Sequence, residues 1–151
     1  VKGFAADVRS EKSIAKAVAK LTYAFANANV PKVNVITGEA YGSAYVTMNS
    51  KALGADVTYA WPDASIGMMD ANEAAKIMYA DEIAKSADVQ SVISEKAAEY
   101  AALQSGVESA AARGYVDTII NPEDTRKYVA AAFEMLYTKR EDRPDKKHGT
   151  V

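Results

Sequence analysis

A turn that contains Gly38 and Gly42 is the feature of this sequence best suited to chemistry. It lies between a β-rich apolar run at Val33–Thr37 and a short helical stretch at Ser43–Ser50. The first N–H groups of a helix have no acceptor inside the helix, so such a turn leaves backbone donors free to hold a negative charge. The pattern therefore predicts stabilisation of a developing anion by backbone groups rather than by side chains.

Side chains that commonly carry out catalysis are scarce in this chain. It has no cysteine and one histidine, His148, near the C-terminal end of the sequence. A thiolate nucleophile and a Cys-ligated metal are excluded, and a Ser–His–Asp triad or multi-His metal site would need the tail to fold back into a cleft. We therefore assign no metal ligands, and expect chemistry from backbone donors, a cofactor or a partner chain.

Composition places the chain among ordinary globular proteins. Its 151 residues are 49% hydrophobic and 25% charged, with a net charge of −2, which fits one domain over residues 1–151. No basic bias favours nucleic acid, and no apolar run is long enough to cross a bilayer. We expect a cytoplasmic protein that neither binds nucleic acid nor inserts into membranes.

Alternating strands and helices must position the glycine turn. Apolar residues recur at helical spacing from Ser10 to Asn29, and Pro31 prevents that helix from continuing. Further strands are predicted at 56–61, 65–69 and 115–120, and further helices at about 70–79, 88–104, 107–113 and 121–136. This alternation favours an α/β layered architecture. Residues 138–151 are charged and contain proline and glycine, so we predict a tail there.

Several ordered segments carry a resemblance to a known family. They are VPKV (30–33), AYGSAY (40–45), GAD (54–56), AWP (60–62), AAARGYVD (110–117), NPEDTR (121–126) and KKHG (146–149). Together they resemble the carboxyltransferase subunits of biotin-dependent acyl-CoA carboxylases and of methylmalonyl-CoA and glutaconyl-CoA decarboxylases. The resemblance covers nearly the whole chain from about Ser10.

That resemblance implies a crotonase-like α/β fold, incomplete at its N-terminal side, corresponding to the C-terminal domain of such a subunit. It implies half of a shared active site, which receives carboxybiotin on a carrier domain. The N-terminal carboxyltransferase domain of another subunit would hold the acyl-CoA, so a homo-oligomer is implied as well. The reaction would move a carboxyl group between biotin and the α carbon of a short acyl-CoA, in either direction.

The same resemblance names the site residues. The backbone N–H groups of Ser43 and Ala44 would form the oxyanion site. Around this turn, Tyr41, Gly42, Tyr45 and Val46 are the candidates to line a biotin pocket, and packing in the core is the alternative for the three side chains Tyr41, Tyr45 and Val46. The family usually has Gly-Gly-Ala at positions 42–44, so Ser43 is a departure from its pattern.

Two other functions remain open at this point. A crotonase-like hydratase or isomerase that does not use biotin would need carboxylates at its site, and Asp70 and Glu73 are the candidates, although both resemble helix-start residues. A non-catalytic assembly domain would use its alanine-rich helices mainly as contacts between subunits.

Overall fold

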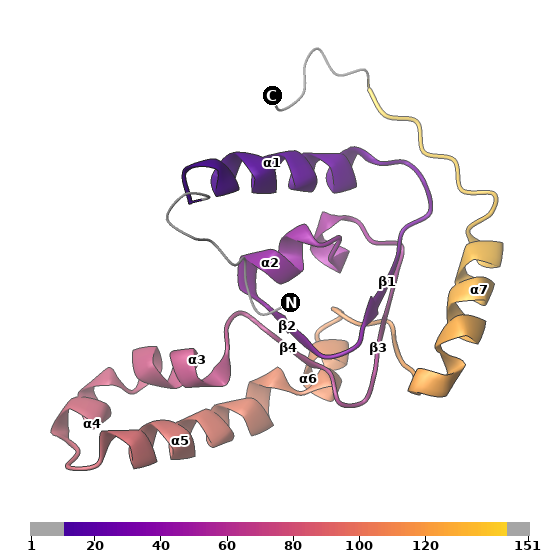
Figure 1. Ribbon diagram of the computed structural model, residues 1–151. Helices are drawn as coiled ribbons and strands as arrows, with labels where there is room; N and C mark the ends of the chain where they lie inside the picture. Colours follow the sequence, from indigo (N-terminus) through magenta and orange to yellow (C-terminus); the bar gives the residue numbers. More distant parts are fainter. Residues whose placement is uncertain (1–10, 145–151) are drawn as a thin grey trace.

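The computed structural model describes residues 11–144, and the helices and strands alternate along the chain (Figure 1). His148 and the segment KKHG lie outside the described residues. The elements are α1 (Glu11–Asn27), β1 (Val33–Ile36), β2 (Glu39–Tyr41), α2 (Gly42–Thr47), η1 (Lys51–Leu53), β3 (Val57–Ala60), β4 (Ser65–Gly67), α3 (Ala71–Met78), α4 (Ala80–Lys85), α5 (Val89–Tyr100), η2 (Ala101–Ser105), α6 (Val107–Ala112), β5 (Thr118–Ile119), η3 (Pro122–Asp124) and α7 (Thr125–Met135). Here η2 is a π-helical segment, whereas η1 and η3 are 3₁₀ turns.

Two small parallel sheets form the centre of the fold. One has the strand order β1-β3-β5, and the other pairs β2 with β4. Parallel neighbours cannot be joined by a tight hairpin, so every connection has to cross over the sheet. The crossover from β1 to β3 carries β2 and α2, and the much longer crossover from β3 to β5 carries β4 and the helices α3 to α6.

The strand β3 separates two hydrophobic clusters. Val57 and Tyr59 pack with Ile120 and Ala132, on the side that α7 covers, whereas Ala60 belongs to the other cluster, which includes residues of α6. Successive side chains of a strand point to opposite faces, so this division follows from the sequence of β3 itself. All four residues of β3 are buried, as expected for a central parallel strand.

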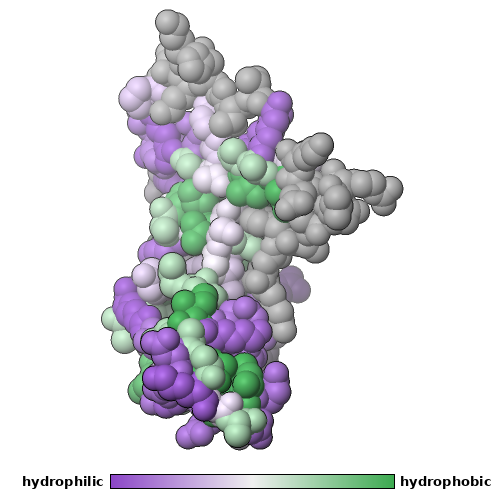
Figure 2. Space-filling model, turned by 90° about the vertical axis from the view of Figure 1, so that its left-hand side faces the viewer, coloured by the Kyte–Doolittle hydropathy of each residue, from purple (hydrophilic) through white to green (hydrophobic). Residues whose placement is uncertain are grey.

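Helices α3, α4 and α5 form an arm that extends away from the sheets (Figure 1). Small and apolar side chains hold α3 against α5, among them the buried Ala74, Ala75, Ile93 and Ala97. Figure 2 shows green apolar atoms among purple hydrophilic ones on this arm, where Ile77 and Met78 are exposed. The sequence predicted α3 and α5 but not α4 between them.

The structure corrects the predicted glycine turn. The stretch between β1 and α2 contains a further short strand, β2. Of the two glycines of the predicted turn, only Gly42 has a left-handed backbone, with φ of 61°. A Cβ atom at position 42 would lie 3.1 Å from the Met68 carbonyl oxygen, whereas one at position 38 would meet nothing within 4 Å. Gly42 is therefore the residue that lets the chain pass from β2 directly into α2.

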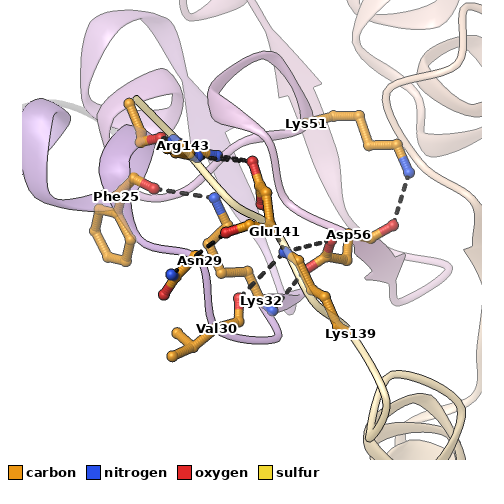
Figure 3. A network of polar contacts seen from close by, with 10 residues as sticks. Phe25, Asn29, Val30, Lys32, Lys51, Asp56, Lys139, Glu141 and Arg143 are labelled. Atoms are coloured by element: carbon orange, nitrogen blue, oxygen red, sulfur yellow. Dashed lines mark hydrogen bonds and ion pairs between the residues drawn. The ribbon is translucent and has the colours of Figure 1, made fainter. Parts of the chain in front are cut away.

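The described part of the predicted tail packs against the fold. It contains no helix or strand, but Lys139 Nζ lies 2.8 Å and 2.9 Å from the two carboxylate oxygens of Asp56. The same carboxylate accepts a 2.7 Å hydrogen bond from the Lys32 N–H, and Lys139 also donates to the Val30 carbonyl. Figure 3 shows this network, which includes Arg143 beside Glu141.

The network lowers the pKa of Asp56. Burial alone would raise the pKa of this carboxyl, but hydrogen bonds from Lys139 and from the Lys32 backbone, with the charges of both lysines, outweigh it. The hydrogen bond with Asp56 in turn raises the pKa of Lys139. The ion pair therefore joins the C-terminal segment to the start of β3.

We expect Gly42→Ala to lower the free energy of unfolding by about 1–2 kcal/mol, because an L side chain is strained in the left-handed region. The added methyl group would also press against the Met68 carbonyl. Urea unfolding of the variant measures the loss. Gly38→Ala is the matched control and should be neutral, so equal losses in the two variants would contradict this role for Gly42.

We expect Asp56→Asn to lower the free energy of unfolding at pH 7 by about 1–3 kcal/mol, because it removes a charged acceptor with two donors. A carboxyl whose pKa is lowered by folding stabilises the fold above its unfolded pKa of about 3.9, and this contribution is lost as the pH falls through the folded pKa. The difference from the unmodified chain should therefore shrink below about pH 4. Urea unfolding from pH 7 down to pH 3 tests this, with Asp142→Asn, at an exposed carboxylate of the same segment, as the control. A difference that stays constant over this range would contradict the ion-pair explanation.

Candidate functional site

The N-terminus of α2 is where the structure places both predicted backbone donors. Gly42 is the first residue of the helix, and Ser43 and Ala44 follow it in the first turn. The N–H groups of a first helical turn have no acceptor inside the helix. The carbonyl groups of the same residues are engaged within it, because Ser43 O accepts from Thr47 Oγ1 at 2.8 Å and Ala44 O from the Met48 N–H at 3.1 Å.

Burial differs sharply between the two residues. Ala44 is 1% exposed and fixes the helix against the fold, while the Ser43 side chain is exposed. A serine here therefore adds a hydroxyl at the surface without displacing packed atoms. The departure from the family's Gly-Gly-Ala pattern is compatible with the turn, because the residue that needs a positive φ is Gly42 and not Ser43.

A hollow of about 240 Å³ lies beside α2. The end of β1 and residues 37–40 form one side of it. Tyr45 of α2 and Met48, the residue directly after that helix, form the other. The Tyr45 hydroxyl is buried and has no hydrogen-bond partner among the described residues. Burial, and to a lesser degree the nearby Tyr115, raises the pKa of Tyr45, so its hydroxyl stays protonated and can serve as a donor.

The remaining predicted contacts point in different directions. Val46 is 42% exposed and lies on the surface of α2. Tyr41 is 6% exposed, and its hydroxyl lies 2.7 Å from Ser65 Oγ in the interior. The predicted site residues therefore lie in different surroundings, with Ser43 and Val46 exposed, Tyr45 beside the hollow, and Ala44 and Tyr41 buried.

The two candidate carboxylates are engaged at the start of α3. Asp70 caps that helix, since its carboxylate accepts from the Asn72 N–H at 2.9 Å. Glu73 forms an ion pair of 2.8 Å with Lys76 one turn later. These contacts are those of ordinary helix-start residues, and neither residue is buried.

Two residues that support the turn have no signal in the sequence. Ser65 and Ser105 lie far from Tyr41 along the chain, yet the fold brings all three together. Their sequence neighbours do not distinguish these two serines from others in the chain, and only the packing shows that they support Tyr41. Within residues 11–144, no cluster of His, Cys, Asp or Glu has the geometry of a metal site, and every helix is too short or too polar to span a bilayer.

Comparison with known proteins identifies the family. The family model described as "Carboxyl transferase domain" matches residues 1–151. The putative propionyl-CoA carboxylase beta chain of Bacillus subtilis is 49% identical over 100% of this chain and 30% of its own length. The biotin-dependent acetyl-/propionyl-coenzyme A carboxylase beta5 subunit of Mycobacterium tuberculosis is 42% identical over 88% of this chain and 25% of its own.

A solved structure agrees in fold as well as in sequence. The transcarboxylase 12S structure, described as a hexamer assembly with methylmalonyl-coenzyme A bound, superposes with a TM-score of 0.91 at 44% identity. It covers 99% of this chain and 29% of its own chain, so the present chain spans about a third or less of the proteins it matches. The predicted crotonase-like α/β fold is confirmed by this superposition. The chain belongs to the carboxyl transferase domain family.

Proposed function

We propose that this chain is the carboxybiotin-side domain of a biotin-dependent acyl-CoA carboxyltransferase. The observation that carries the proposal is the family match over all 151 residues, with the Gly42-Ser43-Ala44 segment at the N-terminus of a helix. A hydratase or isomerase gains no support, because Asp70 and Glu73 are engaged in a cap and an ion pair. The acyl-CoA, the carrier domain and the N-terminal carboxyltransferase domain are the partners proposed for it, in a homo-oligomer and in the cytoplasm.

The donors of α2 suit the chemistry that biotin supplies. When bound, carboxybiotin would supply the carboxyl group, and the negative charge left after its loss would lie on the ureido oxygen. The N–H groups of Ser43 and Ala44 would donate to that oxygen and lower the energy of the charged state. Backbone donors of this kind need no reorganisation during the reaction, and removing one costs roughly 3–4 kcal/mol in transition-state stabilisation.

The surroundings of α2 fit a neutral, amide-like ring. The hollow beside the helix is bounded by apolar residues such as Ile36, Ala40 and Met48, and also by the polar residues Asn34, Thr37 and Glu39. The unpartnered Tyr45 hydroxyl offers a further donor to a polar group that enters. A bound group with one hydrogen-bond acceptor and an apolar body would match this set of contacts better than a multiply charged one.

The activity assay combines the chain with an N-terminal carboxyltransferase domain of the same family. We expect the pair to decarboxylate malonyl-CoA or methylmalonyl-CoA when free biotin is present, measured as released CO₂. Each component alone should be inactive, because neither holds a complete site. Decarboxylation that does not depend on biotin, or none at all from the folded pair, would contradict the proposal.

Ser43→Pro tests the backbone donor directly. Proline lacks the N–H group but is tolerated in the first turn of a helix, so the fold should survive. We expect kcat to fall about 100-fold or more, as for the loss of one oxyanion donor. Circular dichroism and urea unfolding check that the variant is folded.

Ser43→Ala is the control for that variant. It removes the exposed hydroxyl but keeps the N–H group, so kcat should stay within about twofold of the unmodified chain. If a folded Ser43→Pro variant keeps full activity, the donor assignment fails and an assembly role becomes the better explanation.

A further inference from the structure

Beneath the start of α2 lies a short chain of hydrogen-bonded hydroxyl groups. The Tyr41 hydroxyl is 2.7 Å from Ser65 Oγ, and Ser65 Oγ is 3.1 Å from the Ser105 carbonyl oxygen. We call these three groups the Tyr41 relay. They come from β2, from β4 and from the π-helical segment η2, three elements that are distant in the sequence.

The direction of the protons in the relay follows from the groups themselves. A carbonyl oxygen can only accept, so Ser65 must donate its single hydroxyl hydrogen to Ser105. Ser65 Oγ is then left as the acceptor, and the Tyr41 hydroxyl must be the donor to it. The relay therefore has one arrangement in which every member is satisfied.

The relay holds the backbone that leads into α2. Tyr41 pairs with Gly67 in the small sheet and is the residue directly before Gly42. A Cβ atom at Gly67 would lie 3.8 Å from the Tyr41 ring, so the ring is packed closely on β4. On the far side of β4, Ser65 forms an antiparallel bridge with Gly106, which fixes η2 to the same strand.

We propose that Tyr41 is a positioning residue for the oxyanion donors, acting from beneath the turn rather than by contact with biotin. The expected effect on catalysis rests on the proposed function. The expected effect on the position of the α2 backbone rests on the geometry of the relay alone. The N–H groups of Ser43 and Ala44 follow Tyr41 by two and three residues, so a displacement of Tyr41 moves both donors together. Small displacements of positioned groups can cost a large factor in rate, about 100-fold for 1 Å.

The kinetic test compares two Tyr→Phe variants. Tyr41→Phe removes only the first donor of the relay, and we expect kcat to fall about tenfold with KM within twofold, the pattern of an interaction used in the transition state. Tyr59→Phe is the matched control, because Tyr59 is buried like Tyr41 and its hydroxyl is likewise a hydrogen-bond donor. The acceptor of Tyr59 is the Tyr128 carbonyl, on the face of β3 that α7 covers. Its kcat and KM should both stay within twofold.

The reconstituted pair of domains is used for these measurements, at a temperature where all variants are folded. Equal kcat values for Tyr41→Phe and Tyr59→Phe would overturn the catalytic part of the proposal, whatever the two variants lose in stability.

A double variant tests whether the groups act as one relay. Ser65→Ala should lower kcat at least as much as Tyr41→Phe, because it leaves the Tyr41 hydroxyl without its acceptor. Residues in one network are not additive, so Tyr41→Phe combined with Ser65→Ala should be no slower than Ser65→Ala alone. A loss in the double variant equal to the product of the two single losses would overturn the relay.

Hydrogen exchange separates this proposal from the proposed function. In the isolated chain, Tyr41→Phe should speed exchange of the α2 amides at positions 46–48 by about threefold or more, and leave those of α7 unchanged, because local opening is governed by local contacts. Unchanged α2 exchange would overturn the positioning role even in an active enzyme. Faster α2 exchange in a protein without carboxyl transfer would instead retain the positioning role and reject the proposed function.

Discussion

The complete burial of β3 is the constraint on which the rest of the structure depends. All four of its residues are buried, so its backbone groups must be paired on both sides and its side chains covered on both faces. The strands β1 and β5 provide the pairing, and the two hydrophobic clusters provide the cover. Parallel pairing with both neighbours then requires crossover connections, and helices α2 to α6 lie within them.

The position of the site follows from that constraint. The crossover from β1 to β3 is short, and it must leave the first sheet, form β2 and turn into α2 within a few residues. Gly42 makes this turn possible, and as a consequence α2 begins directly after β2. Further along the helix, Tyr45 borders the hollow at the end of β1. Chemistry based on backbone groups is well suited to such a place, because its donors are held by the fold and not by flexible side chains.

The two sheets are stabilised by different physical means. At the end where β1 and β3 begin, charged groups dominate, with Lys32, Asp56 and Lys139 joining the C-terminal segment to the strands. In the β2–β4 sheet, which leads into α2, the support consists of uncharged groups, namely the hydroxyls of Tyr41 and Ser65 and the carbonyl of Ser105. A neutral support would suit the proposed oxyanion site, because it adds no fixed charge of its own beside the donors.

The sequence by itself determined the order of most elements and the family of the chain. Apolar periodicity located α1, α5 and α7, and Pro31 indicated where α1 ends. The ordered segments led to the family and to the proposed donors Ser43 and Ala44. These features are local, because helical spacing and a turn residue act within a few positions of the chain. The comparisons confirmed the family and the fold, whereas the roles of the site residues remain predictions.

Only the tertiary structure decided which surroundings each residue around the turn has. Neighbouring positions such as Tyr41, Tyr45 and Val46 look equivalent in the sequence, yet they point into the interior, beside the hollow and to the surface. The short strand β2, the hydrogen bonds that link Tyr41 to Ser65 and Ser65 to the Ser105 carbonyl, and the ion pair of Lys139 with Asp56 were likewise not predictable. Each of these depends on contacts between segments distant in the chain, and such contacts exist only after the strands have chosen their neighbours.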